Sequence, residues 1–303
     1  MMIQQALAQA GLARPAGTTK STDYFEALVD KRVRSTSSRL RWIVVAAISL
    51  LVVAGAVFGW YLWRHPGAVV QQFNYGDATG GGIAAQNRYT VFLLAGSRLP
   101  AARSPQDLVG FCTGFAIAPE LLATNSHCVR AAAGYASVYA LMNGVQGAIY
   151  PVVRMVPHPG YRPGEISPDV GLMSVATRRQ HLVTMADQAE LAQIAPGVPV
   201  FLYGFPGRLN NEEAPEATFI KGDIGRVTGF DQKLGDFGRN TLLQHSAFSA
   251  GGTSGSPMFN SSGHVIGINA GGYVENGQSL SGYNFGMRID LIQSLYPLLA
   301  AGS

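Results

Sequence analysis

After residue 87 the sequence is a succession of short apolar runs that glycine and proline interrupt at frequent intervals. The runs cover residues 89–95, 111–118, 198–203, 242–245 and 265–268. Many short strands with frequent turn residues predict an all-β barrel or sandwich, because alternating β and α units need longer helical patterns between the strands. We expect an all-β domain over residues 88–303, with a connector between two halves near residues 178–196 and a C-terminal helix over residues 289–299.

Composition narrows the class of protein further. The chain is 47% apolar and 13% charged, which predicts a globular core rather than wholesale disorder. Residues 1–42 contain seven Lys or Arg and three Asp or Glu, whereas the remainder contains fifteen of each. The main domain is therefore electrically balanced, and we expect no nucleic-acid partner. No phosphate-binding or zinc-binding motif is present in the sequence, so we expect no cofactor and no metal.

Residues 42–63 contain no charged side chain and begin and end with tryptophan. At about 1.5 Å per residue, a helix of this length matches the roughly 30 Å hydrocarbon core of a bilayer, and aromatic rings at both ends are typical of the lipid interface. Five Lys or Arg residues lie between residues 31 and 41, which predicts a cytoplasmic N-terminus. We expect a retained single-span anchor over residues 42–64; a cleaved signal peptide and a buried core helix are the alternatives.

The anchor divides the chain into segments with different expected locations. Residues 1–41 would be cytoplasmic, and an apolar stripe within residues 22–34 predicts a short helix there, either as a site for a cytoplasmic partner or as part of a fraying tail. Residues 65–87 are glycine-rich and predict a linker. Everything after residue 64 would lie outside the cytoplasm, in the periplasm if the cell is bacterial.

A serine flanked by glycines on both sides is the first candidate for chemistry. Gly251, Gly252 and Gly255 surround Ser254, and an apolar strand follows. Glycines permit backbone conformations that a Cβ forbids, so that N–H groups can converge beside an exposed hydroxyl. That arrangement suits acyl transfer, which needs a nucleophile and donors aimed at the developing oxyanion. A glycine-rich hairpin without chemistry is the alternative.

Residues 111–129 read as a hairpin with a turn at Pro119, and the two cysteines of the chain, Cys112 and Cys128, stand on either side of it. Outside the cytoplasm we expect them to be oxidised, and a disulfide here would fix the loop that carries His127. Closing a loop of this size contributes about 3 kcal/mol to the free energy of unfolding. Two unpaired buried thiols are the alternative.

Four segments resemble the trypsin/chymotrypsin-like serine peptidases, and the resemblance covers about residues 88–300. Residues 124–128 (TNSHC) resemble the histidine segment of that family. Residues 167–173 (SPDVGLM) are similar to its aspartate segment, and residues 153–161 (VRMVPHPGY) to the run that precedes it. Residues 252–257 (GTSGSP) resemble the nucleophile motif, closest to the glutamyl-endopeptidase and HtrA-like branches. The order His, Asp, Ser is that of the family.

The resemblance implies a fold and a set of roles. The fold would be two six-stranded antiparallel β-barrels with the site between them. Ser254 would attack the scissile carbonyl, His127 would take its proton and return it to the leaving amine, and Asp169 would hold the imidazole tautomer. The backbone N–H groups of Gly252 and Ser254 would form the oxyanion hole, each contributing about 3 kcal/mol to transition-state stabilisation.

The sequence also departs from the family's branches. Thr253 stands where activatable digestive members have an aspartate, so activation by a newly cut N-terminus is not expected. Asn269 stands where glutamyl endopeptidases tend to have a histidine, so glutamate specificity is not expected. We expect no PDZ domain after the catalytic domain. By resemblance, Phe248 would lie near the base of the specificity pocket, with an open wall formed by Ala270, Gly271 and Gly272.

Such a pocket contains no acid, and we expect a preference for a medium-sized apolar side chain. Other candidates for the chemistry fit less well: Ser256 precedes a proline, His158 lies between two prolines, and His245 and His264 lie in strand patterns. The function predicted is a membrane-anchored extracytoplasmic serine endopeptidase that cleaves protein or peptide substrates. A catalytically silent binding module of the same fold and an esterase with the same triad remain as alternatives.

Overall fold

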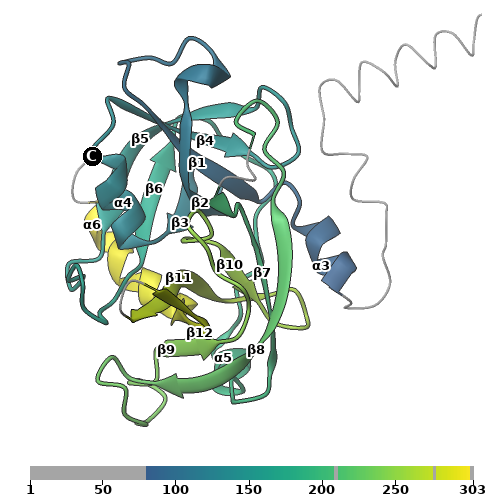
Figure 1. Cartoon of the computed structure of the whole chain (residues 1–303), viewed down its shortest axis with the longest axis vertical. Coiled ribbons are helices and arrows are strands. Elements are labelled where there is room, and N and C mark those ends of the chain that lie inside the picture. Colours follow the sequence, from purple (N-terminus) through teal and green to yellow (C-terminus); the bar gives the residue numbers. More distant parts are fainter. Residues whose placement is uncertain (1–79, 208–210, 276–277, 301–303) are drawn as a thin grey trace, which may run out of the picture. The chain divides into compact units, whose positions relative to one another are not determined.

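The computed structural model describes residues 80–207, 211–275 and 278–300, and its strands close into two barrels (Figure 1). Neighbouring strands are antiparallel in both barrels. The order is β1-β2-β3-β6-β5-β4 around the first barrel and β10-β11-β12-β9-β8-β7 around the second. The predicted all-β architecture of two six-stranded barrels is confirmed.

The strands follow the short apolar runs of the sequence. The first barrel consists of β1 (Val91–Ser97), β2 (Val109–Ala118), β3 (Leu121–Thr124), β4 (Ser137–Met142), β5 (Ile149–Pro157) and β6 (Gly171–Val175). The second barrel consists of β7 (Pro199–Gly204), β8 (Thr218–Thr228), β9 (Leu242–His245), β10 (Pro257–Phe259), β11 (Val265–Glu275) and β12 (Gln278–Arg288). The connector between the barrels therefore runs from the end of β6 at Val175 to the start of β7 at Pro199.

Strand β1 is apolar without alternation because both of its faces are buried. Successive side chains of a strand point to opposite faces. Val91, Leu93 and Ala95 belong to the core that continues into the second barrel. Phe92 and Leu94 belong to a second cluster, which lies within the first barrel and contains both cysteines. Strand β1 therefore contributes one face to each of the two apolar clusters.

The helical segments among the described residues are short. They are α3 (Gly80–Gln86), the 3₁₀ turn η2 (Pro105–Asp107), α4 (Ser126–Ala132), α5 (Gln188–Ala192), the 3₁₀ segment η4 (Ile289–Leu295) and α6 (Tyr296–Ala300). Helix α3 corrects the linker prediction, which ran to residue 87. Ile83 of this helix is buried in the core, and a Cβ on Gly80 would stand 2.9 Å from the ring of Phe219, so the glycine permits close packing.

The C-terminal segment is helical, as predicted, but it is not one α-helix. Residues 289–295 form the 3₁₀ segment η4, and α6 begins only at Tyr296. Pro297 stands at the start of α6 and has no N–H to donate to the preceding turn. Ile289, Ile292 and Leu295 are buried, so the apolar spacing that predicted the helix does mark its packed face.

Several predictions lie outside the described residues: the cytoplasmic segment with its short helix, the anchor over residues 42–64, and the linker as far as residue 79. Among the residues that are described, no helix is both long enough and apolar enough to span a bilayer.

Candidate active site

His127 lies in the first turn of helix α4, directly after strand β3. Strand β3 ends at Thr124, and Asn125 is the N-cap residue of the helix. The Asn125 side-chain amide donates to the carbonyl of Asp169 at 2.7 Å, and the Ser126 hydroxyl donates to the carbonyl of Val170, also at 2.7 Å. These two bonds fix the start of the helix against the segment that leads into β6, and they bring His127 beside Asp169.

The carboxylate of Asp169 accepts two hydrogen bonds from His127. One oxygen lies 2.6 Å from the ring Nδ1, and the other accepts the backbone N–H at 2.9 Å. The Asp169 side chain is 11% exposed and the His127 side chain 33% exposed, so the carboxylate is largely shielded while the imidazole reaches solvent. Since the carboxylate can only accept, Nδ1 bears the proton and Nε2 is left as the basic nitrogen.

Cys112 and Cys128 form the predicted disulfide, with 6.1 Å between their Cα atoms. Cys112 belongs to β2 and Cys128 to α4, so the bridge joins the strand of the predicted hairpin to the residue that follows His127. Both cysteines are buried. Cys128 Sγ and His127 Nε2 are 3.6 Å apart. Although these groups lie close together, both sulfurs are in the disulfide and are unavailable as thiolate ligands for a metal.

The glycine-flanked serine lies in the turn before strand β10. Gly252 has a φ of +95° and Gly255 a φ of +85°, a region that residues with a Cβ rarely adopt. A Cβ on Gly255 would stand 2.0 Å from the carbonyl oxygen of Thr113. The carbonyl of Ser254 accepts the N–H of Thr113 at 2.8 Å, and the N–H of Gly255 donates to the carbonyl of Asn269, also at 2.8 Å. The serine turn is thus held between β2 of the first barrel and β11 of the second.

The Ser254 side chain is half-buried, and its hydroxyl donates to the carbonyl of Ala270 at 3.5 Å. Within the described part of the chain no hydrogen bond joins this hydroxyl to His127. The backbone N–H groups of Gly252 and Ser254 likewise have no hydrogen-bond partner among the described residues. The carbonyl of Gly251, on the same peptide unit as the Gly252 N–H, accepts the N–H of Gly207. Two donors are therefore left available beside the serine.

The residues predicted for the specificity pocket differ in exposure. Phe248 is 60% exposed, so its ring lies at the surface. Ala270 and Gly271 are half-buried, and Gly272 is exposed. A Cβ built on Gly271, which has a φ of +135°, would meet no atom within 4 Å. The space beside the Ala270–Gly272 segment is open at this position.

The other candidate residues have structural partners or are inaccessible. His245 is fully buried, and its Nε2 lies 3.1 Å from the side-chain oxygen of Asn269; burial lowers its pKa to about 4, although the bond to Asn269 acts in the opposite direction. His264 Nδ1 lies 2.8 Å from a carboxylate oxygen of Glu190. The ring of His158 accepts the N–H of Gly160, and burial lowers its pKa.

Ser256 is fully buried, with its hydroxyl enclosed beside Gly204, where a Cβ would clash with it. A substrate cannot reach this hydroxyl. Of the two serines in the turn, only Ser254 has an accessible side chain.

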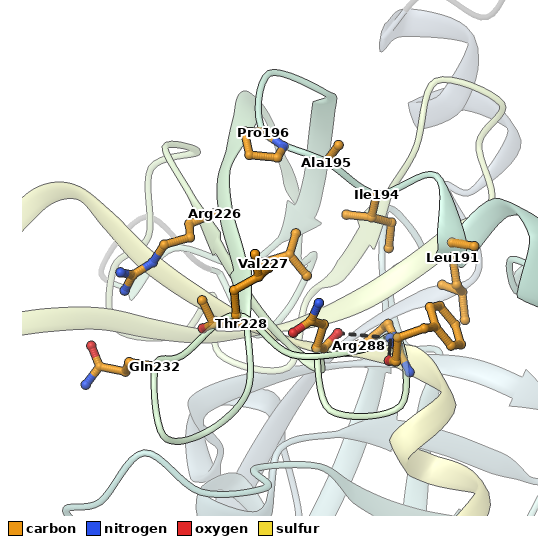
Figure 2. Close-up of a pocket in the computed structure, with 13 residues that line it drawn as sticks. Leu191, Ile194, Ala195, Pro196, Arg226, Val227, Thr228, Gln232 and Arg288 are labelled. Atoms are coloured by element: carbon orange, nitrogen blue, oxygen red, sulfur yellow. Dashed lines mark hydrogen bonds between the residues drawn. The ribbon is translucent and has the colours of Figure 1, made fainter.

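A cavity of about 720 Å³ lies in the second barrel, away from these groups (Figure 2). Leu191 and Ile194 come from α5 and the segment after it, Val227 comes from β8, and Leu234 from the β8–β9 connection. Arg288 also lines the cavity, but its guanidinium is bonded to Asp290 and to backbone carbonyls. None of the predicted site residues is among the lining residues, so this cavity is separate from the candidate active site.

Two six-stranded barrels that bring a histidine–aspartate pair and a glycine-flanked serine onto adjoining segments define the class of trypsin-like peptidases. Sequence comparison gives the same class independently. The chain belongs to the trypsin-like peptidase domain family, whose family model matches residues 112–268. The predicted family resemblance is confirmed.

Solved structures of HtrA-type proteases have the same fold. The HtrA-type protease AlgW with a decapeptide matches with a TM-score of 0.56 and 15% identity, over 74% of this chain and 68% of that chain. AlgW with a tripeptide matches with a TM-score of 0.52 and 18% identity, over 72% of this chain and 63% of that chain. A search among curated proteins found no match. At this level of identity, the likeness establishes the fold alone.

Sequence reasoning assigned no role to Thr113, whose hydroxyl donates to the carbonyl of Gly252 at 2.8 Å. In that part of β2, Cys112 was the only residue that the sequence connected with the candidate site. In the sequence, Asn269 indicates only that a substrate-reading histidine is missing; in the structure, its side chain donates to the carbonyl of Thr253 at 2.9 Å. Both contacts join residues far apart in the chain, and no local pattern in the sequence predicts them.

Proposed function

We propose that this chain is a serine endopeptidase whose triad is Ser254, His127 and Asp169. The observation that carries the proposal is that the Asp169 carboxylate accepts two hydrogen bonds from His127. One comes from ring Nδ1 at 2.6 Å and the other from the backbone N–H at 2.9 Å. A carboxylate so placed fixes both the tautomer and the orientation of the imidazole. The shielding of Asp169 strengthens this interaction, because water competes with it only weakly.

The proposed reaction follows from these positions. Ser254 Oγ attacks the carbonyl carbon of the scissile peptide bond while its proton passes to His127 Nε2. The bond to the amine then breaks, and His127 returns the proton to the leaving nitrogen, which leaves an acyl-serine. Water, deprotonated by the same imidazole, hydrolyses the ester. The N–H groups of Gly252 and Ser254, which have no partner in the described part of the chain, stabilise the oxyanion of each tetrahedral intermediate.

A second candidate, the catalytically silent binding module, is favoured by one observation. The Ser254 hydroxyl is directed to the carbonyl of Ala270 rather than to His127. Catalytic hydrogen bonds are often long or misaligned in free enzymes and tighten when substrate binds, so this geometry is compatible with a resting peptidase. We therefore favour the enzyme, and the labelling experiment below separates the two.

A fluorophosphonate probe tests the proposed nucleophile. The wild type should be labelled covalently, Ser254→Ala should not be labelled, and Ser256→Ala should be labelled like the wild type because that buried hydroxyl is inaccessible. Mass spectrometry of the labelled peptide would identify the modified serine. A wild type that is not labelled, while its thermal unfolding shows a folded protein, would establish the silent module.

The substrates we propose are proteins or peptides. Support comes from the family and from the HtrA-type structures, which contain bound peptides. We propose a preference for a medium-sized apolar side chain before the cleaved bond, since the predicted pocket residues Ala270, Gly271 and Gly272 carry no charge. A panel of peptides that differ only at this position tests the preference, and a clear advantage for basic or acidic residues would refute it. Hydrolysis of short esters without cleavage of peptides would indicate an esterase.

We further propose that residues 42–63 anchor the protein in a membrane, with the peptidase domain on the extracytoplasmic side. The support is the uncharged length of the segment and the Lys and Arg residues that precede it. The full-length chain should remain in the membrane pellet after alkaline carbonate washing, and a chain that begins at residue 65 should not. Protease added to intact cells or spheroplasts should digest the peptidase domain only if it faces outward.

A further inference from the structure

Thr113 connects the first barrel to the serine turn through two different groups. It lies in β2 and is fully buried. Its backbone N–H donates to the carbonyl of Ser254, and its hydroxyl donates to the carbonyl of Gly252, both at 2.8 Å. The same hydroxyl accepts the N–H of Phe205 at 3.1 Å. One side chain is thus bonded to two separate segments of the second barrel.

The hydroxyl of Thr113 holds the carbonyl end of the peptide unit between Gly252 and Thr253, whose N–H end donates to the carbonyl of Ala250 at 3.0 Å. The carbonyl of Gly252 has no other hydrogen-bond partner among the described residues. The peptide units on either side are held from elsewhere: the carbonyl of Gly251 accepts from Gly207, and the carbonyl of Thr253 accepts from the side chain of Asn269. The unit between them is held within the turn by Ala250, and Thr113 supplies its only described contact with the first barrel.

That middle unit sets the angle between the two donors proposed for the oxyanion hole. In a trans peptide the C=O and N–H point in opposite directions, so holding a carbonyl also aims the N–H of the same unit. The N–H of Gly252 and the N–H of Ser254 belong to the first and third units. Gly252 has the widest backbone freedom of any residue type, and rotation at this residue would turn the two donors away from a common point.

We propose that the Thr113 hydroxyl is a positioning group for the oxyanion hole, acting through the carbonyl of Gly252. This inference depends on the proposed function, because it assumes that Ser254 is the nucleophile. Thr113 also follows Cys112, which is disulfide-bonded to the residue after His127. The barrel that carries His127 therefore also aligns the two N–H donors on the other barrel. Cys112 and Thr113, which are adjacent in β2, hold the histidine side and the serine side of the site respectively.

Thr113→Val tests the proposal because it removes the hydroxyl and keeps the shape of the side chain. Thr113→Ser restores the hydroxyl. Thr90→Val is the matched control, since the Thr90 hydroxyl is also buried and donates to a backbone carbonyl, that of Asn87 at 3.0 Å, but it is not near the serine turn. Each variant is assayed with a peptide amide substrate, and its affinity is measured for a peptide boronate whose oxygen occupies the oxyanion hole.

For Thr113→Val we expect kcat and kcat/KM to fall together by about ten- to a hundredfold, less than the loss of a whole oxyanion donor, with KM unchanged. The inhibition constant of the boronate should rise by a similar factor. Peptide binding to Ser254→Ala should not change when Thr113→Val is added. Thr113→Ser and Thr90→Val should retain wild-type kinetics. This pattern separates positioning from a general loss of stability, which would lower the active fraction without changing the boronate constant.

Two results would overturn the inference. If fluorophosphonate labels Ser254 in the wild type and Thr113→Val matches Thr90→Val in kcat and boronate affinity, the positioning role is wrong and the proposed function stands. If the wild type is not labelled, the proposed function fails and the inference fails with it. Should Thr113→Val not fold, the comparison is made between Thr113→Ser and Thr113→Ala, with equal kinetics again counting against the role.

Discussion

The histidine side and the serine side of the candidate site are held in different ways. On the histidine side, His127 is fixed by side chains and by covalent bonding: the Asp169 carboxylate holds the ring, and a disulfide follows the histidine directly. On the serine side, Ser254 is held mostly through backbone groups in a turn that requires two glycines with positive φ. The geometry of the histidine side depends on the presence of particular side chains. The geometry of the serine side depends mainly on glycines, which have no side chain.

This difference predicts which substitutions each side tolerates. On the histidine side, loss of a polar group should remove chemistry and leave the fold. On the serine side, addition of a single methyl group should be enough to misplace the donors, because a Cβ on Gly252 would stand 2.4 Å from the carbonyl oxygen of Phe205. The predictions below test this contrast.

Asp169→Asn should have the largest effect. If the amide oxygen accepts the backbone N–H of His127, the amide NH2 group faces Nδ1 and can only donate to it. The imidazole proton then moves to Nε2, which would no longer be the basic nitrogen. We expect kcat to fall by about 10⁴, as the same exchange does in other serine peptidase triads. Steady-state kinetics with a peptide amide measures this. Asp187→Asn is the control, since Asp187 is the N-cap of α5 and asparagine caps a helix equally well. A decrease of less than tenfold would show that Asp169 does not orient the imidazole.

Gly252→Ala should have the next largest effect. The substitution forces a Cβ into a backbone with a φ of +95°, and relief of the clash with Phe205 must move the Gly252 N–H. Loss of one oxyanion donor lowers kcat by about 10²–10³. Gly263→Ala is the matched control, because Gly263 also has a positive φ, +77°, and its Cβ would meet nothing closer than 3.5 Å. If both variants lose equal activity, backbone strain rather than donor placement is responsible.

Removal of the disulfide tests the covalent support on the histidine side. The double variant Cys112→Ser with Cys128→Ser should lose about 3 kcal/mol in free energy of unfolding, as expected for a loop of this size. At a temperature where it is folded, the variant should keep most of its kcat, because the bonds from Asp169 to His127 remain. Urea unfolding and kinetics at the same temperature measure the two effects. Dithiothreitol should destabilise the wild type and not the variant; a loss of kcat equal to that of Asp169→Asn would show that the bridge itself aligns the ring.

The same contrast explains how much the sequence could predict. The β2–β3 hairpin and its disulfide were predictable because the strands, the turn at Pro119 and both cysteines lie within a short stretch. The flanking glycines marked Ser254 as a candidate nucleophile. The family resemblance then supplied Asp169 and linked both residues to His127, which no periodicity could have done. The sequence therefore predicted the structure best where residues that are close together in the chain determine it.

Features that depend on distant contacts were missed or altered. Helix α3 replaced part of the predicted linker because Ile83 packs into a core formed by residues much later in the chain. Phe248 lies at the surface, since the depth of a loop side chain depends on the segments around it. The hydroxyl of Thr113 reaches across the two barrels, and its role becomes visible only when the strands are in place.

Acid should destabilise the serine side through a buried histidine, and this is the smallest effect that we predict. His245 is fully buried and bonded to Asn269, whose side chain in turn donates to the carbonyl of Thr253 in the serine turn. Burial lowers the pKa of His245 from 6.5 to about 4. Between these values the unfolded chain binds a proton that the folded chain does not, so stability must fall as the pH decreases from about 6.5 towards 4. At pH 5 the loss relative to pH 8 is about 2 kcal/mol.

His245→Gln isolates this contribution, because glutamine can donate to Asn269 and does not titrate. Urea unfolding at pH 8 and pH 5 should show a smaller acid-induced loss in this variant than in the wild type, by about 2 kcal/mol. His264→Gln is the control, since His264 is partly exposed and paired with Glu190 rather than buried. Equilibrium unfolding is the appropriate measurement, because it reports the free energy of unfolding directly. An equal pH dependence in all three proteins would mean that His245 is protonated in the folded state, and the serine side would then be no more sensitive to acid than the histidine side.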